Sequence, residues 1–444
     1  MKTSRSIVES YQDCNRYRYN MYHLNGTGVV AVKKSIPLVT GSHVHKGVER
    51  LLKRVMIGED PSIDHAVGVA VEEYEKEVTD KGFRGKGVQT DRQQEFTFLE
   101  QRALVEALVR AWYIAEMPLI VKRYKVLAVE REIEPLPLAP NIEFMAKVDA
   151  ELQEIETGDY HNYSLKTMKQ WNERAENSYK SDLQGITEIW AVEEDNKRAN
   201  EILDKIASYV ADVELYNSRR DLLKNLNQIE QFARSKIRDK KVMGVRFCIL
   251  IKGIRKYPDY NSTDPNTLMI TYSPLIRGYK NITPTSINYA HSWFYPNPEN
   301  KSGKSALGKG WEPFNVWEQS DMNIKSWIEF LASGQCQSEL GDIIKAQVVT
   351  PVEMFRDEEE ITLGIQEIKQ IETHIFEGLQ LLDEGVIDKE IIMARYFSHN
   401  RKMCMFHYGE KCEYNDLCWN NRVKEDPVAS ELYEIRTPHH VTEK

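Results

Sequence analysis

The segment 141–190 holds an acid and a lysine at a spacing that brings them together. Two stretches rich in β-branched and aromatic residues flank the turn-forming run ETGD at 156–159. Because side chains alternate across a strand, this pattern predicts a hairpin in which Asp149 on the first strand and Lys166 on the second converge. A carboxylate can bind a hard cation such as Mg²⁺, and an ammonium group can stabilise developing negative charge.

Further polar side chains lie on the second strand and on the segment that follows it. Ser164 shares one face of the second strand with Lys166, two residues further on. The segment 182–190 is predicted to be helical, which puts Gln184 and Glu188 one turn apart on a single face.

Two helices near the N-terminus carry further candidate ligands. Segment 6–23 has apolar and aromatic residues at helical spacing, which predicts an amphipathic helix with Cys14 as a small buried side chain. The run TGSHVHKGVERLLKR starts with capping residues and carries His45 one turn before Glu49. Taken alone, a single helical histidine is most often structural or exposed.

Three of the six cysteines lie close together near the C-terminus. Cys404, Cys412 and Cys418 are separated by seven and then five residues. Such clusters typically bind a metal in reducing compartments, because thiolates suit zinc and iron. Cys14 is the first candidate for a fourth ligand. The alternatives are zinc with His399 or His407 as a ligand, and a loop of free thiols.

Together these features resemble the PD-(D/E)xK nuclease superfamily, and within it the RecB-like branch. The order Cys helix, His helix, Asp strand, x-Lys strand, Gln helix and C-terminal cysteine cluster is similar to that of AddB and the CRISPR-adaptation exonucleases, over most of residues 1–190 and 395–420. The resemblance implies an α/β fold with a restriction-endonuclease-like core, in which a mixed β-sheet is flanked by helices, plus large helical insertions. Proteins of this kind are common in bacteriophage genomes.

The resemblance also implies a function: a metal-dependent DNA nuclease, and more specifically an exonuclease, that hydrolyses phosphodiester bonds in DNA recombination, repair or end processing. Asp149 and His45 would bind Mg²⁺ or Mn²⁺, Lys166 would orient water or stabilise charge, and Gln184 would position substrate or water. A 4Fe-4S cluster would tie the chain ends together and border the DNA entrance, held by Cys14, Cys404, Cys412 and Cys418.

The sequence departs from the family pattern at two site positions and in one spacing. Ser164 stands where the second acid is expected, and Glu188 where a tyrosine is expected. Glu188 can supply the missing charge from the helix, which would keep the site active. The alternative is a degraded nuclease fold that acts as a DNA-binding or scaffolding protein. Because seven residues separate the second and third cysteines where the family usually has two, an unrelated zinc-stapled structural protein is a third interpretation.

Composition sets limits on these interpretations. A chain of 444 residues with 41% hydrophobic residues can bury a large core. The net charge of −9 excludes a basic coat for nucleic acid, but a local basic groove remains compatible with it. No apolar run approaches the roughly 20 residues of a membrane helix, and the N-terminus has no signal-peptide core. We expect a cytoplasmic protein of a bacterial or phage-infected cell, without a membrane partner.

We expect a single nuclease-like domain over residues 1–424. Its helical insertions would be 56–92 and 193–241, the cysteine segment 398–419 would close onto the N-terminal helix, and residues 425–444 would form a frayed polar tail. Residues 281–345, rich in aromatic residues, predict either irregular packed structure or a stacking platform for single-stranded bases. Glu130 is either an exposed strand carboxylate or an extra acid beside the metal.

The expected macromolecular partner is DNA, single-stranded or with free ends, and a helicase or recombination protein is a further candidate. Four cations near the ends of two predicted strands either line a DNA path or form a solvated rim: Lys252, Arg255, Lys256 and Arg277. Cys248 and Cys336 are predicted to be structural.

Overall fold

The computed structural model describes the chain in segments. These are residues 1–32, 34–81, 83–84, 91–168, 173–180, 182–210, 220–251, 294–296, 311–313, 348–406 and 412–437. Several predicted features lie outside them: Lys252, Arg255, Lys256, Arg277, His407, Cys336 and most of segment 281–345. Within that segment, β9 (Phe294–Pro296) and β10 (Trp311–Pro313) pair antiparallel.

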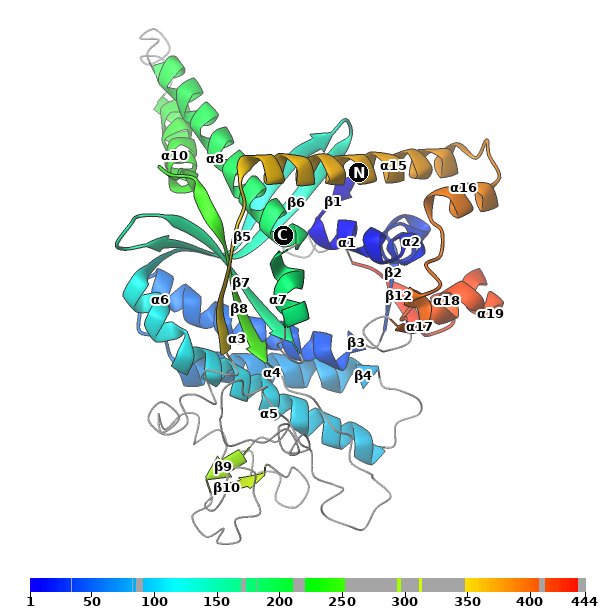
Figure 1. The fold of residues 1–444 in the computed structure, drawn as a ribbon. Coiled ribbons are helices and arrows are strands. Elements are labelled where there is room, and N and C mark those ends of the chain that lie inside the picture. The colour runs from blue at the N-terminus through cyan, green and yellow to red at the C-terminus, as the bar shows by residue number, and fades with distance from the viewer. Residues whose placement is uncertain are drawn as a thin grey trace.

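A mixed β-sheet forms the centre of the protein, and helices lie on both of its faces (Figure 1). The strand order is β1-β6-β7-β8-β11, with β5 paired to β6. The β1–β6 and β7–β8 pairs are parallel, and the other pairs are antiparallel. The strands are β1 (Lys2–Thr3), β5 (Tyr124–Ala139), β6 (Ile142–Glu154), β7 (Tyr160–Met168), β8 (Val242–Ile251) and β11 (Val348–Phe355). The prediction of an α/β fold with a helix-flanked mixed sheet is confirmed.

The predicted hairpin is the pair β6 and β7. Its turn closes with a hydrogen bond of 2.8 Å from the Gly158 N–H to the Glu154 carbonyl oxygen. Gly158 has φ of +75°, a conformation that favours glycine because it has no Cβ. The register places Ala150 opposite Tyr163 and Gln153 opposite Tyr160. Local turn chemistry therefore sets the position of this hairpin.

Helices α3 to α6 pack together on one face of the sheet, in the lower half of Figure 1. They are α3 (Ile36–Met56), α4 (Ile63–Lys81), α5 (Asp91–Ala115) and α6 (Met117–Arg123). Leu51, Tyr74 and Trp112 are completely buried between them and the strands. Cys248 on β8 is also fully buried in this core, as predicted. The short strands β3 (Lys34–Ser35) and β4 (Phe83–Arg84) pair parallel beside this layer.

On the other face, α8 and α15 pack against the sheet, with α7 nearby (Figure 1). They are α7 (Glu173–Lys180), α8 (Leu183–Val210) and α15 (Glu358–Glu384). Helix α15 begins where the side chain of Asp357 accepts a hydrogen bond from Glu360 N–H, and it ends at Gly385, which has a left-handed backbone conformation. The second half of α8 pairs with α10 (Arg220–Lys236), and this helical hairpin extends away from the sheet.

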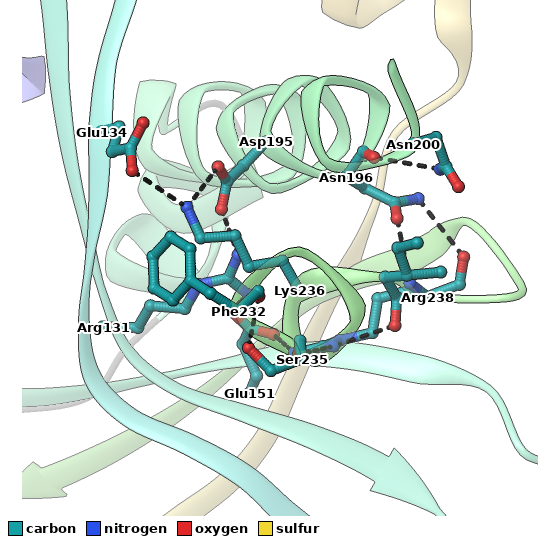
Figure 2. Close-up of polar contacts among 11 residues, drawn as sticks. Arg131, Glu134, Glu151, Asp195, Asn196, Asn200, Phe232, Ser235, Lys236 and Arg238 are labelled. Atoms are coloured by element: carbon teal, nitrogen blue, oxygen red, sulfur yellow. Dashed lines mark hydrogen bonds and ion pairs between the residues drawn. The ribbon is translucent and has the colours of Figure 1, made fainter. Parts of the chain in front are cut away.

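A buried network of charges holds the base of this helical hairpin on the sheet (Figure 2). Arg131 on β5 pairs with both Glu151 on β6 and Asp195 on α8. Lys236, at the end of α10, pairs with Asp195 at 3.1 Å, and Arg238 pairs with Glu151 at 2.6 Å. These contacts join four elements, so α8 is fixed at its middle as well as at its start.

The N-terminal helices lie beside the C-terminal helices (Figure 1). The predicted N-terminal helix is two helices, α1 (Arg5–Asp13) and α2 (Asn15–Tyr22), because Cys14 between them is extended, with φ of −164° and ψ of 118°. They meet a C-terminal group of short helices: α16 (Lys389–Tyr396), α17 (Met403–Phe406), α18 (Asn415–Trp419) and α19 (Asn421–Glu425). Arg18 and Glu372 form a fully buried bidentate ion pair, with both contacts at 2.6 Å, which ties α2 to α15.

The prediction of a frayed tail is wrong for part of its length. Strand β12 (Tyr433–Ile435) pairs antiparallel with β2 (Val29–Ala31), which follows the single-turn helix η1 (Leu24–Gly26). Tyr433 is buried and stacks on Tyr414, and this burial anchors the tail. Within the described segments, no helix is long and apolar enough to cross a membrane.

Candidate functional site

Asp149 lies where β6 and β7 stop pairing. The last register pair is Ala150 with Tyr163, and the side chain of Asp149 occupies the fork just beyond it. Its Oδ2 accepts hydrogen bonds from the Leu165 N–H at 2.9 Å and from Ser164 Oγ at 3.1 Å. The predicted convergence of the acid with the second strand is confirmed, and Ser164 occupies the position next to it.

Helix α8 extends this contact into a chain of hydrogen bonds. Gln184 Nε2 donates to Ser164 Oγ at 2.6 Å and also to Glu188 Oε1. Gln184, Glu188 and Ser164 are all buried. The i,i+4 spacing on α8 therefore does what the sequence predicts, since it aims both side chains at the hairpin.

Glu188 is a buried carboxyl group in an unusual state. Burial, with the nearby charge of Asp149, raises the pKa of Glu188 to about 8, although Lys166, Gln184 and Arg5 partly offset the rise. Its Oε2 is buried and has no hydrogen-bond partner among the described residues. A buried polar atom without a partner is costly, so this oxygen is well suited to an incoming ligand.

Lys166 belongs to the same electrostatic group. Its pKa is lowered, first by burial and then by the positive charge of Arg5, and nearby carboxylates oppose this shift: Asp149, Glu188 and Asp182. Lys166 is therefore close to the acids, as the strand alternation predicts. The carboxylate site is defined here as Asp149, Ser164, Lys166, Gln184 and Glu188.

Arg5 on α1 also contacts the carboxylate site, and the sequence did not predict this contact. It donates to Gln184 Oε1 at 2.7 Å, which leaves the Gln184 NH₂ group to face Ser164 and Glu188. It also lies 3.8 Å from Asp182. Helix α1 reaches this place because β1 pairs with β6, about 140 residues away, and no local sequence pattern reports such a pairing.

Glu130 on β5 faces Asp149 on the neighbouring strand. The flanking register pairs are Val129 with Ala150 and Arg131 with Val148, which puts these two acids opposite each other. The Glu130 carboxylate pairs with Lys147 at 2.5 Å and is only 20% exposed. Burial raises the pKa of Glu130, and the charge of Asp149 adds to the rise. The interpretation as an exposed carboxylate is wrong, and an acid beside the site is favoured.

Helix α3, which carries His45, packs against the strands β5 and β7. At one side, Gly41 packs so closely on β7 that a Cβ there would lie 2.8 Å from Oγ1 of Thr167. At the other side, Glu49 is close enough to add to the rise in the pKa of Glu130 on β5. His45 is one helical turn from both Gly41 and Glu49, and β6 lies between β7 and β5. His45 therefore belongs to the helical layer on the face of the sheet opposite α8.

The four predicted cysteine ligands line one enclosed pocket. These residues, the cysteine pocket, are Cys14, Cys404, Cys412 and Cys418, and His399 also lines it. Cys14 comes from the break between α1 and α2, and the other three come from the C-terminal helices. All four thiols are free. The predicted closure of the C-terminal cysteines onto the N-terminal helices is thus present.

Hydrogen bonds and burial shape the chemistry of the cysteine pocket. The Asn400 N–H donates to Cys14 Sγ at 3.3 Å, and Asn20 Nδ2 donates to Cys418 Sγ at 3.6 Å. Burial raises the pKa of Cys412 to about 12 and that of Cys418 to about 11. Both thiols are therefore protonated at neutral pH in the absence of a metal, and binding of a metal would release these protons.

Neither group of side chains is arranged as a finished ligand sphere. Across the described segments, no three His, Cys, Asp or Glu side chains are grouped so that they could hold a metal ion. The metal assignments accordingly depend on shared pockets, burial and hydrogen bonding. No family model matches this sequence, and a search of curated proteins finds no match.

Proposed function

We propose that this protein is a metal-dependent DNA nuclease of the RecB-like PD-(D/E)xK type, with a restriction-endonuclease-like core. The observation that carries the proposal is the hydrogen-bond chain from Asp149 through Ser164 and Gln184 to Glu188, with Lys166 beside it. It joins the acid strand, the x-Lys strand and the Gln helix of the family pattern at one point. An exonuclease in DNA recombination, repair or end processing is the activity that this pattern favours.

The donor set fits a hard divalent cation. Asp149 and Glu188 supply carboxylate oxygens, one of them the unpartnered Oε2 of Glu188, and His45 supplies a nitrogen that Mn²⁺ accepts well. Glu130 supplies a further carboxylate on the facing strand. When bound, Mg²⁺ or Mn²⁺ would lower the pKa of a coordinated water and neutralise charge on the scissile phosphate.

The residues of the chain contribute orientation and charge. Lys166, with its lowered pKa, stabilises the negative charge that develops on the phosphate or orients the attacking water. Gln184 is held by Arg5 through its carbonyl oxygen, so its NH₂ group keeps Glu188 and Ser164 in position. In this proposal Glu188 provides the negative charge that Ser164 lacks.

The cysteine pocket fits an iron–sulfur cluster. Four thiols from both chain ends line one cavity, and two of them accept N–H···S hydrogen bonds, which tune such clusters. We propose a 4Fe-4S cluster there. Structural zinc with His399 as one ligand is the alternative, since His399 lines the same pocket.

Cleavage of end-labelled DNA tests the proposed function. Anaerobically purified protein is incubated with single- and double-stranded oligonucleotides and Mg²⁺ or Mn²⁺, beside the variants Asp149→Ala and Lys166→Ala. We expect metal-dependent cleavage that each variant abolishes. Asp159→Ala, in the exposed turn of the same hairpin, is the matched control and should cleave normally. Cleavage that survives both site variants would refute the assignment.

A non-catalytic DNA-binding or scaffolding protein is the second candidate. The observation in its favour is that Asp149 Oδ2 already accepts hydrogen bonds from Ser164 and from the Leu165 N–H, while Glu188 with its raised pKa is neutral at pH 7. This candidate predicts DNA binding without cleavage. A helicase or recombination partner would then supply the chemistry.

A further inference from the structure

An exposed aromatic pair lies beside the cysteine pocket. Trp419, the last residue of α18, stacks on His399 with ring centroids 4.9 Å apart and an interplanar angle of 28°. Half of the Trp419 surface remains exposed. A large aromatic side chain that is fixed on one side and open on the other is the geometry of a stacking surface.

Positive charges converge on this pair. Arg401 and Lys402 line one hollow together with His399, and the charges of Arg16 and Lys424 also act on the His399 imidazole. All the charged groups that act on the His399 imidazole are thus cationic. Along the described chain, Arg401 and Lys424 form no ion pair with a carboxylate, and both side chains are exposed. Exposed cations without partners are available to an anionic ligand.

A polar hollow continues from the aromatic pair. It is open to solvent, and its lining includes Ser398, His399, Asn400, Arg401 and Lys402, with Asp13 from the N-terminal helices. Asp13 is its one carboxylate. Amide, hydroxyl and cationic groups in such a hollow are the partners that phosphate oxygens use.

The combination selects one class of partner. Cations alone would suit any polyanion, such as heparin or an acidic protein segment. A flat aromatic face next to cations suits a polymer that alternates phosphates with planar bases, and the bases are free to stack only in a single strand. We propose that Trp419, His399, Arg401, Lys402 and Lys424 form a binding site for single-stranded DNA, the Trp419 platform.

The proposal rests on the proposed DNA-directed function, but its test does not require cleavage. Helix α1 connects the two places, because Arg5 near its start contacts Gln184 and Cys14 at its end lines the hollow. A strand held on the platform would be guided along α1 toward the carboxylate site.

The test measures binding of fluorescent single-stranded oligonucleotides, with normal or abasic nucleotides, by anisotropy. The full chain carries Asp149→Ala and the solutions contain a chelator, so that no cleavage occurs. Normal DNA should bind more tightly than abasic DNA. Trp419→Ala should weaken binding of normal DNA about 10-fold, as expected for the loss of one base stack, and should leave abasic DNA unchanged. Trp419→Phe should retain most of the affinity.

A second variant tests the charges independently of the aromatic ring. Arg401→Ala combined with Lys402→Ala should weaken both oligonucleotides and make the salt dependence of binding less steep, because fewer counterions are released. Heparin competes with the charges alone, so it should displace abasic DNA more readily than normal DNA.

Phe232 on α10 offers a matched control. It is 54% exposed and has the Lys236 ammonium 4.4 Å from its ring centroid, but that lysine is paired with Asp195. Phe232→Ala should leave DNA binding unchanged. Equal affinity of normal and abasic DNA, or equal loss in Phe232→Ala and Trp419→Ala, would overturn the proposal. If these binding results are obtained but the protein does not cleave DNA, the proposed binding site is supported and only the nuclease assignment is wrong.

Discussion

At the scale of single residues, the position of one carboxylate decides whether the site is catalytic. In the proposed nuclease, Ser164 leaves the strand without its second acid, whereas Glu188 places a carboxyl group on the helix within reach of the same glutamine. Because Glu188 is buried and its pKa is raised to about 8, the metal-free protein holds it as a neutral acid. Binding of a cation would require the loss of this proton.

The raised pKa of Glu188 predicts a specific pH dependence. A carboxyl group that binds its proton more tightly in the folded state contributes stability at low pH. That contribution is lost as the pH rises from the unfolded value of 4.5 to about 8. We therefore expect the melting temperature of chelator-treated protein to fall over this range. Glu188→Gln, which mimics the neutral acid, should reduce the fall.

The same linkage governs cation affinity. Mn²⁺ binding, measured by calorimetry, should become tighter as the pH rises toward 8 and should release a proton. An affinity that does not change between pH 6 and 8 in the wild-type protein would contradict this role of Glu188.

Rules that act within a few residues predict two features of the site. Strand alternation predicts that Asp149 meets the second strand, and the helical i,i+4 spacing puts Gln184 and Glu188 on one face of α8. The same rules do not predict the positions of Arg5 and Glu130. Arg5 reaches the site because β1 pairs with β6 across about 140 residues, and the burial of Glu130 depends on the register of β5 with β6.

At the scale of elements, α8 serves both the carboxylate site and the helical hairpin. Gln184 and Glu188 lie in its first turns. Asp195 lies seven residues after Glu188, on the same face of the helix. The Asp195 contacts to Arg131 and Lys236 therefore fix the helix that carries the site (Figure 2).

Removal of Asp195 should destabilise the protein strongly. Asp195→Ala leaves Arg131 and Lys236, both largely buried, with fewer opposite charges, and breaking such a network costs about 3 kcal/mol. The free energy of unfolding from urea titration provides the measurement. Glu230→Ala, which breaks a mostly exposed pair with Arg234 on α10, should change it by less than about 1 kcal/mol. Equal effects of the two variants would show that the network does not anchor the hairpin.

The helical elements near the termini were less predictable than the hairpin. Apolar spacing over residues 6–23 predicts one helix, but packing of Cys14 into the pocket breaks it in two. The polar composition of the tail does not predict the strand β12. This three-residue strand has a single buried side chain, Tyr433, which is too weak a pattern to recognise in the sequence. Tertiary contacts decided both cases.

At the scale of the whole molecule, several contacts join the N-terminal helices to the C-terminal part of the chain. They include the Arg18–Glu372 ion pair, the β2–β12 pairing and the cysteine pocket. The first two are complete in the protein itself. In the proposed protein a cluster would join the thiols of the cysteine pocket, so its binding should contribute to the stability of the molecule.

Anaerobically purified protein should be brown, with a broad absorption near roughly 400 nm. Cys404→Ser should remove this absorption and lower the melting temperature, because the C-terminal helices lose their link to α1 and α2. Cys248→Ala, in the core on β8, should keep the colour and serves as the control. If the wild-type protein is colourless and contains zinc, the cluster assignment is wrong and the cysteine pocket is a zinc site.

The central claim is that the acid lost at Ser164 is supplied by Glu188. Metal-dependent DNA cleavage should be measured for the wild type, Glu188→Gln, Ser164→Asp and the double variant. The wild type should cleave, Glu188→Gln should be slower by about 100-fold or more, and the double variant should regain activity because the acid returns to the strand. Cleavage by Glu188→Gln at the wild-type rate, or no cleavage by intact wild-type protein, would contradict the claim.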